Sequence, residues 1–173
     1  MNLRTELEPK IEIAENLFPQ IMELISKYDE AYDIGDKQGM QSTIDKINLL
    51  TNKNLKIEDL FEYWEGESQE EIAFKISLPE PIKVENISKE ELLEILKRIQ
   101  CFDDEGISCK LSELDVPLSD ALVYTYYIPL LIRNFSHPEP SNLFDRQLIN
   151  GEYIEYSVEE IADIILSHKF IML

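Results

Sequence analysis

The sequence predicts an α+β fold, in which an N-terminal helical hairpin is followed by a small antiparallel or mixed sheet with helices packed on one face. An apolar stripe with helical spacing runs through residues 3–32, which predicts the start of the hairpin. An Asn-Gly pair at residues 150–151 separates two short runs rich in β-favouring residues, which predicts paired strands. We expect residues 1–66 to hold the hairpin and a short helix, and residues 67–173 to hold the α+β portion of one continuous domain.

The first predicted helix has an apolar side chain at every third or fourth position, close to a heptad seam. Pro9 fits either the first turn of this helix or a kink in one that begins earlier, and Pro19 is expected to bend it. After a break at residues 33–36, a second helix is predicted over residues 37–52, which completes the hairpin. The same stripe could instead form the seam of a homodimer, so the sequence leaves monomer and homodimer undecided. The stripe consists of Leu3, Leu7, Ile11, Ala14, Phe18, Ile21, Ile25, Tyr28 and Tyr32.

The middle of the chain is expected to form a short helix, a strand and a longer, capped helix. The short helix lies in residues 54–66 and ends at a glycine. Residues 71–78 alternate apolar and polar side chains and are followed by two prolines, which predicts a strand. A Ser-x-x-Glu capping box opens a helix over residues 88–100, and residues 101–117 are expected to form a loop.

The last third of the chain is expected to hold two helices and the β-hairpin. Residues 119–134 favour a helix, with a buried strand as the alternative because tyrosine and β-branched residues are frequent there. The Asn-Gly pair predicts a hairpin with strands at residues 144–149 and 152–156. A second capping box starts a final helix over residues 157–168.

The charge of the chain predicts the kind of partner it binds. The sequence has 35 Asp and Glu against 16 Lys and Arg, a formal net charge of -19, and the excess is spread along the chain. Such a field repels nucleic acid and anionic membranes and attracts cationic proteins. We therefore expect a basic protein partner, and neither nucleic acid nor a membrane.

A cytoplasmic location is expected from three further features. The N-terminal residues lack the pattern of a signal peptide. The longest apolar stretch, residues 121–132, is too short to span a bilayer. Cys101 and Cys109 are interpreted as unpaired thiols, as is usual inside cells.

The sequence carries no short motif that identifies a common enzyme class. It has no phosphate-binding loop, dinucleotide fingerprint, nucleophile elbow or zinc-ligand pair. His137 lies in a proline-flanked loop, and His168 ends the last predicted helix, where it complements the helix dipole. The sequence therefore favours a non-enzymatic protein without catalytic residues, cofactor or metal. An enzyme that assembles distant residues, such as His137, Arg133 or Arg146 facing a carboxylate in a deep pocket, is kept as an alternative.

The candidate partner-binding residues form two groups. In the first, aromatic side chains alternate with carboxylates, which suits a surface that receives Lys- and Arg-rich partners. The alternative interpretation places these aromatics in the core with their polar tips at the surface. The second group is an acidic trio without the ligand spacing of a calcium loop. Together the predicted residues are Glu58, Asp59, Phe61, Glu62, Tyr63, Trp64, Glu65, Asp103, Asp104 and Glu105.

These features predict an acidic cytosolic protein-binding module. Bacterial immunity proteins and enzyme inhibitors have this general profile, small, acidic and without catalytic motifs, and their carboxylates stand in for phosphates in the basic active site of a nuclease-like toxin. The comparison is an analogy that rests on charge and on missing motifs. The alternatives are an oligomeric adaptor or structural protein that uses the N-terminal helices, and the enzyme described above.

Overall fold

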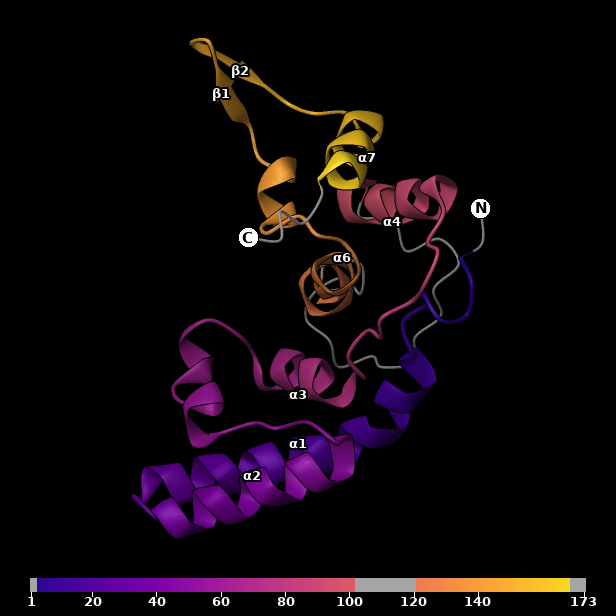
Figure 1. The fold of residues 1–173 in the computed structure, drawn as a ribbon. Helices are drawn as coiled ribbons and strands as arrows, with labels where there is room; N and C mark the ends of the chain where they lie inside the picture. The colour runs from indigo at the N-terminus through magenta and orange to yellow at the C-terminus, as the bar shows by residue number, and fades with distance from the viewer. Residues whose placement is uncertain (1–2, 102–120, 169–173) are drawn as a thin grey trace, which may run out of the picture. The chain divides into compact units, whose positions relative to one another are not determined.

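The computed structural model describes residues 3–101 and 121–168, which are mostly helical and include a two-stranded antiparallel sheet (Figure 1). The predicted α+β class with an N-terminal helical hairpin is confirmed. The described chain divides into two compact units. Residues 10–79 form the first, here called the helical unit, and the second, the mixed unit, contains residues 3–9, 80–101 and 121–168. The sequence predicts one continuous domain, in which the hairpin part ends at residue 66 and the α+β part begins at residue 67. This division stays a prediction.

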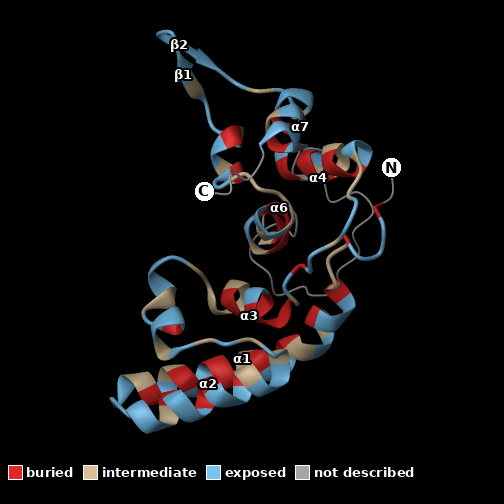
Figure 2. Cartoon of the chain, in the orientation of Figure 1, coloured by how far each residue is buried: buried red, intermediate tan, exposed pale blue. Residues whose placement is uncertain are grey.

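The helical unit is built on the hairpin of α1 (Ile11–Asp33) and α2 (Lys37–Thr51). α1 packs against both α2 and α3 (Gln69–Ser77), and the apolar stripe of α1 is buried (Figure 2). Asp36 starts α2, because its side chain accepts a hydrogen bond from the backbone N–H of Gly39 at 3.0 Å. Burial of each large apolar side chain stabilises this packing by about 1.5–3 kcal/mol.

The first helix begins later than the stripe predicts. Pro9 and Lys10 precede α1, and the residues before them form a turn closed by a hydrogen bond from the N–H of Leu7 to the carbonyl of Arg4. These residues fold with the mixed unit, so Leu3 and Leu7 are buried there and do not extend α1. Pro19 lies inside α1, which continues through it.

The strand predicted over residues 71–78 is wrong, because this segment is the helix α3. Ser68 and Glu71 form a capping box in which each side chain accepts a hydrogen bond from the other residue's backbone N–H, at 3.2 and 2.7 Å. Ala73 and Ser77, which lie between the alternating apolar residues, are buried as well. The buried side chains therefore cover one broad face of the helix. The capping box and the broad buried face favour a helix over a strand in this segment.

The single short helix predicted over residues 54–66 is instead two 3-10 turns, η1 (Ile57–Leu60) and η2 (Tyr63–Glu65). Glu62 separates them with a left-handed backbone at φ 53°, which ends one turn and starts the next.

Helices and a β-hairpin make up the mixed unit. Its helices α4 and α7 pack against each other, η3 contacts α4 and α6, and η4 contacts α6 and α7. Residues 121–134 are helical, as favoured, and the cap expected at residues 119–120 lies outside the described residues. The elements are α4 (Lys89–Cys101), the π-helical turn η3 (Val123–Tyr127), α6 (Ile128–Asn134), the 3-10 turn η4 (Pro140–Phe144), β1 (Gln147–Ile149), β2 (Glu152–Ile154) and α7 (Val158–Ser167).

Hydrogen-bonded ion pairs attach residues 3–9 to the rest of the mixed unit. The guanidinium of Arg98, on α4, donates to the carboxylate of Glu8 at 2.7 Å and to the hydroxyl of Tyr127 at 3.1 Å. The Arg98 side chain is only 16% exposed. Arg4 donates to the buried carboxylate of Glu91 at 2.6 Å, and Glu91 also accepts from the N–H of Ser88 as the cap of α4.

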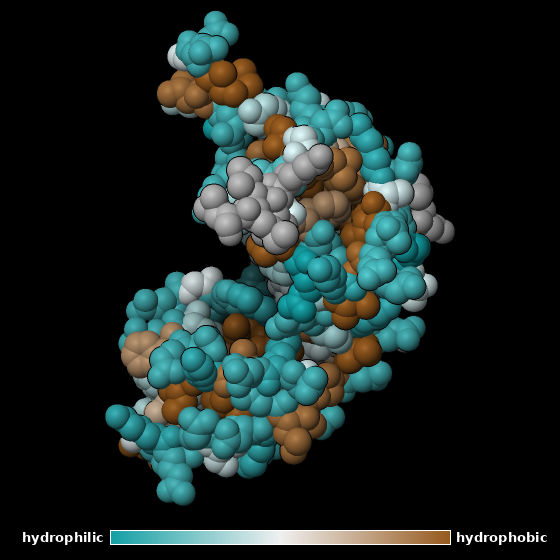
Figure 3. All heavy atoms as spheres, viewed as in Figure 1, coloured by the Kyte–Doolittle hydropathy of each residue, from teal (hydrophilic) through white to brown (hydrophobic). Residues whose placement is uncertain are grey.

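The β-hairpin follows the Asn-Gly prediction, with strands shorter than expected. Asn150 and Gly151 both have positive φ, 52° and 87°, as a two-residue type I′ turn requires. Leu148 faces Tyr153 across the strands, and both are more than half exposed. Figure 3 shows apolar side chains on this hairpin below its hydrophilic tip.

We predict that Arg98→Ala destabilises the chain by about 2–3 kcal/mol, because it leaves the carboxylate of Glu8 and the hydroxyl of Tyr127 without their donor in a partly buried position. Lys27→Ala is the matched control, since the Lys27–Glu23 pair is 52% and 67% exposed. Its loss should change stability by less than about 0.5 kcal/mol. Urea unfolding followed by circular dichroism measures both, and equal midpoints for the two variants would contradict the role of Arg98.

We also predict that Glu91→Gln weakens the dependence of stability on pH. The hydrogen bond from Arg4 holds the pKa of Glu91 below 4.5, the ordinary value for a glutamate. A lowered pKa in the folded chain stabilises it above pH 4.5, and this contribution is lost as pH falls through the folded pKa. The variant should therefore be less stable than the wild type at pH 7 and approach it as the pH falls below 4.5. Thermal unfolding of the wild type and the variant at pH 7 and below pH 4.5 tests this. A difference in stability between the two proteins that is the same at both pH values would contradict it.

Candidate functional site

Aromatic side chains from two segments of the helical unit meet beside the C-terminal part of α1. The ring of Tyr32, on α1, packs edge-on against Phe61 and Trp64, with centroid distances of 5.7 and 4.9 Å. Tyr63 packs edge-on against Trp64 at 5.4 Å. Edge-to-face pairs of this kind contribute about 0.5–1.5 kcal/mol beyond the burial of their area. We call these four residues the aromatic cluster.

The segment that carries Phe61, Tyr63 and Trp64 is held against α1 by a buried side chain and a hydrogen bond. Leu60 is fully buried, and the hydroxyl of Tyr28 donates to the carbonyl of Ile57 at 3.1 Å. The carboxylate of Asp59 accepts from the backbone N–H of Lys56 at 2.8 Å and closes η1. The left-handed backbone at Glu62 then leads directly into η2.

Two carboxylates hold the tyrosines of the aromatic cluster. The hydroxyl of Tyr63 donates to Asp29 at 2.7 Å, and the hydroxyl of Tyr32 donates to Glu62 at 3.2 Å. Burial raises the pKa of Asp29, while its hydrogen bond with Tyr63 lowers it in part. The second oxygen of Asp29 is buried and has no hydrogen-bond partner in the structure. Asp29 therefore fixes Tyr63 at the cost of a partly desolvated carboxylate.

The charges around the aromatic cluster are negative. Burial and the hydrogen bond to Glu62 raise the pKa of Tyr32, and the charges of Glu62, Asp33 and Glu65 raise it further. For Tyr63, burial, the hydrogen bond to Asp29 and the charges of Asp29 and Glu70 all raise the pKa. Carboxylates of Asp29, Asp33, Glu62, Glu65 and Glu70 thus raise the pKa of these two tyrosines.

The sequence left two interpretations of these aromatics, an exposed binding surface or core residues with polar tips at the surface. The observed exposure agrees in part with each. Phe61 and Trp64 are 54% and 46% exposed, whereas Tyr63 is half-buried against α1. Glu58, Asp59 and Glu65 are exposed, and Glu62 is half-buried. The acidic trio Asp103, Asp104 and Glu105 lies outside the described residues. The structure therefore groups the first predicted set around an aromatic patch, and partner binding there stays a prediction.

Tyr32 and Asp29 belong to this site but were absent from the predicted set. Both lie on α1, and Tyr32 appeared only as the last member of the apolar stripe. The one sequence signal was that the stripe ends in two tyrosines, whose hydroxyl groups need polar partners when buried. Which partners they find depends on contacts between segments distant in sequence.

The arginines of the alternative enzyme site lie in surface ion pairs. Arg133 donates to Glu80 and Arg146 donates to Glu155, each at 2.6 Å. All four side chains are at least 46% exposed. Both pairs are therefore solvent-exposed ion pairs and not parts of a buried site.

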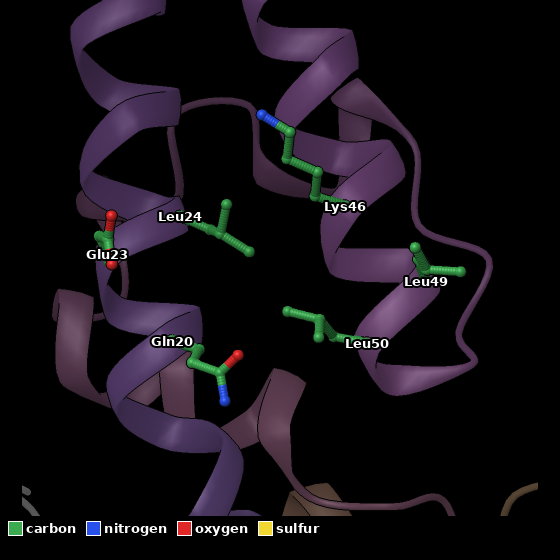
Figure 4. Close-up of a pocket in the computed structure, with 6 residues that line it drawn as sticks. All are labelled: Gln20, Glu23, Leu24, Lys46, Leu49 and Leu50. Carbon is green, nitrogen blue, oxygen red and sulfur yellow. The ribbon is translucent and has the colours of Figure 1, made fainter.

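A separate shallow groove of about 270 Å³ lies between α1 and α2 (Figure 4). The side chains of Leu24 and Leu50 extend into it from opposite helices, and Leu49 is exposed beside it. Its polar lining consists of Gln20, Glu23 and Lys46. This composition fits apolar contact better than acid–base chemistry.

Comparison with known proteins finds no match, neither among family models nor among curated proteins nor among solved structures. Within the described ranges, no helix combines the length and the apolar character that crossing a membrane requires. The aromatic cluster and its carboxylates are therefore interpreted on their own geometry.

We predict that Tyr63→Phe destabilises the helical unit by about 1–2 kcal/mol, because Asp29 loses its donor while its carboxylate stays partly buried. The emission of Trp64, whose ring contacts Tyr63, should shift in the same variant. Tyr153→Phe is the matched control, since Tyr153 is 73% exposed on the β-hairpin, and it should change stability by less than about 0.5 kcal/mol. Equal urea midpoints in the two variants would show that the Tyr63–Asp29 hydrogen bond does not hold the site.

Proposed function

We propose that this protein is an acidic protein-binding module that uses the aromatic cluster and its surrounding carboxylates to bind a Lys- or Arg-rich surface of another protein. The observation that carries this proposal is the combination of half-exposed Phe61 and Trp64 with a charge environment made of carboxylates. Aromatic anchors and opposite charge are the two features that dominate protein interfaces of this kind.

The aromatic rings supply the anchoring contact. Trp64 rests edge-on against Tyr32 and Tyr63, so its orientation is set before a partner arrives. A preorganised anchor loses less conformational entropy on binding than a free surface side chain. The face of an indole is also the strongest aromatic site for a guanidinium or ammonium group, worth about 0.5–2 kcal/mol.

The carboxylates supply attraction and orientation. Glu58 and Glu65 are exposed within the same short segment as the aromatic anchors. A carboxylate accepts an arginine fork through two parallel hydrogen bonds, which fixes direction as well as charge. The net charge of -19 adds a long-range field that speeds association with a basic partner.

An inhibitor of the immunity-protein type is the specific form of this proposal. A basic surface that binds nucleic acid presents Lys and Arg side chains at phosphate positions. Carboxylates arranged beside an aromatic anchor can occupy those positions, since both groups accept bidentate hydrogen bonds from arginine. Such a protein would mask its partner without any chemistry of its own.

We predict that an oligo-arginine peptide binds at the aromatic cluster and changes the fluorescence of Trp64, which is the sole tryptophan of the chain. The titration is made in about 0.02 M and about 0.2 M salt, and binding should weaken at the higher salt because of screening. Phe61→Ala and the double variant Glu58→Gln with Glu65→Gln should each weaken binding at least about fivefold, or about 1 kcal/mol.

The matched control is Glu152→Gln with Glu159→Gln, which removes the same charge from exposed positions of the mixed unit. It should weaken binding less than about twofold, since it changes only the long-range field. Equal losses in the two double variants would contradict a defined site and leave general charge attraction. An oligo-glutamate peptide that changes the fluorescence equally would contradict the selectivity for cations.

A further inference from the structure

The two histidines of the chain lie against each other in the mixed unit, although they are far apart in the sequence. His137 belongs to the connection between α6 and η4, and His168 is the C-terminal cap of α7. Their ring centroids are 5.1 Å apart, and the ring planes are inclined by 55°. The packing of α7 against η4 brings the two segments together.

One imidazole nitrogen at this contact has no partner. Nδ1 of His137 is buried, and no group of the described residues forms a hydrogen bond with it. A buried polar atom in that state costs about 1–3 kcal/mol unless a ligand or an ordered water satisfies it. A metal ion shared with the neighbouring imidazole is one ligand that would satisfy this nitrogen.

We propose that His137 and His168 together bind one divalent transition-metal ion, with Zn²⁺ as the reference case. An ion bound at about 2 Å to one nitrogen of each ring in tetrahedral geometry places the ring centroids about 5 Å apart. The observed 5.1 Å matches this spacing. Imidazole is a preferred ligand of zinc, copper and nickel ions, whereas magnesium and calcium prefer oxygen.

The surroundings of the pair favour the metal-binding form of the imidazoles. A metal ion binds the neutral form of an imidazole, and Nδ1 of His137 is buried without a hydrogen-bond partner among the described residues. Glu139 is the nearby carboxylate, and it accepts a hydrogen bond from the side chain of Asn142 at 2.7 Å. The described residues hold no group of three or more His, Cys, Asp or Glu side chains suited to a metal ion. Water molecules would therefore complete the coordination.

A bound ion would connect the end of α7 to the segment before η4. Because both ligands belong to the mixed unit, the metal site is independent of the aromatic cluster in the helical unit. Its presence or absence leaves the proposed partner-binding function unchanged.

The test is a calorimetric titration of the full chain with Zn²⁺ at pH 7 in a buffer that does not bind metals. We expect saturable binding of one ion per chain. His168→Gln should weaken it at least about tenfold, and the double variant with His137→Gln should abolish it. His168 is exposed, so the single variant changes the site without changing the core.

Two controls separate this site from other cation binding. A chain with Cys101→Ser and Cys109→Ser should keep its Zn²⁺ affinity, because the thiols are not the proposed ligands. Ca²⁺ should bind wild type and histidine variants equally, since it reports on the carboxylates of the acidic surface. Absence of saturable Zn²⁺ binding, Zn²⁺ affinity retained in the double histidine variant, or affinity lost with the cysteines would each overturn the proposal.

Discussion

The surplus of carboxylates over basic side chains is the constraint on which this architecture depends, since the chain has 35 acidic residues and only 16 basic ones. A carboxylate that leaves water needs donors, and few cations are present to provide them. The backbone is the first alternative source. In three capping boxes a glutamate accepts the N–H of a serine and so begins α3, α4 and α7. These three glutamates thus mark where α3, α4 and α7 start, with the backbone of a serine as the donor.

Two arginines, Arg4 and Arg98, join segments that are distant in sequence. Arg98 and Arg4 connect α4 and its cap to the residues before α1, with Glu8 and Glu91 as their partners. An arginine suits this role because one guanidinium can serve several acceptors, as Arg98 does with Glu8 and Tyr127. These contacts also explain why the N-terminal apolar stripe does not continue as one helix. Leu3 and Leu7 are buried in the mixed unit, while α1 begins at Ile11.

Local signals in the sequence predicted the elements that local contacts decide. The Asn150-Gly151 turn and the boxes at Ser88 and Ser157 are formed by neighbours along the chain, and all three were predicted correctly. The segment after Ser68 was predicted wrongly because its alternating apolar residues fit a strand, whereas its cap and its buried Ala73 fit a helix. The aromatic patch was found in part, since Phe61, Tyr63 and Trp64 are adjacent. Tyr32, Asp29 and the contact between the two histidines depend on packing between distant segments, which periodicity does not encode.

The same charge constraint supports the proposal that the aromatic cluster binds a cationic partner. A tyrosine hydroxyl satisfies a lone pair of a carboxylate but leaves its negative charge in place. Asp29 and Glu62 both receive tyrosine hydroxyls, and the charges of carboxylates raise the pKa of Tyr32 and Tyr63. Elsewhere in the fold, Glu8 and Glu91 receive guanidinium groups and are neutralised. The carboxylates that accept tyrosine hydroxyls keep their negative charge near the exposed rings, where the proposed partner would supply an arginine or lysine.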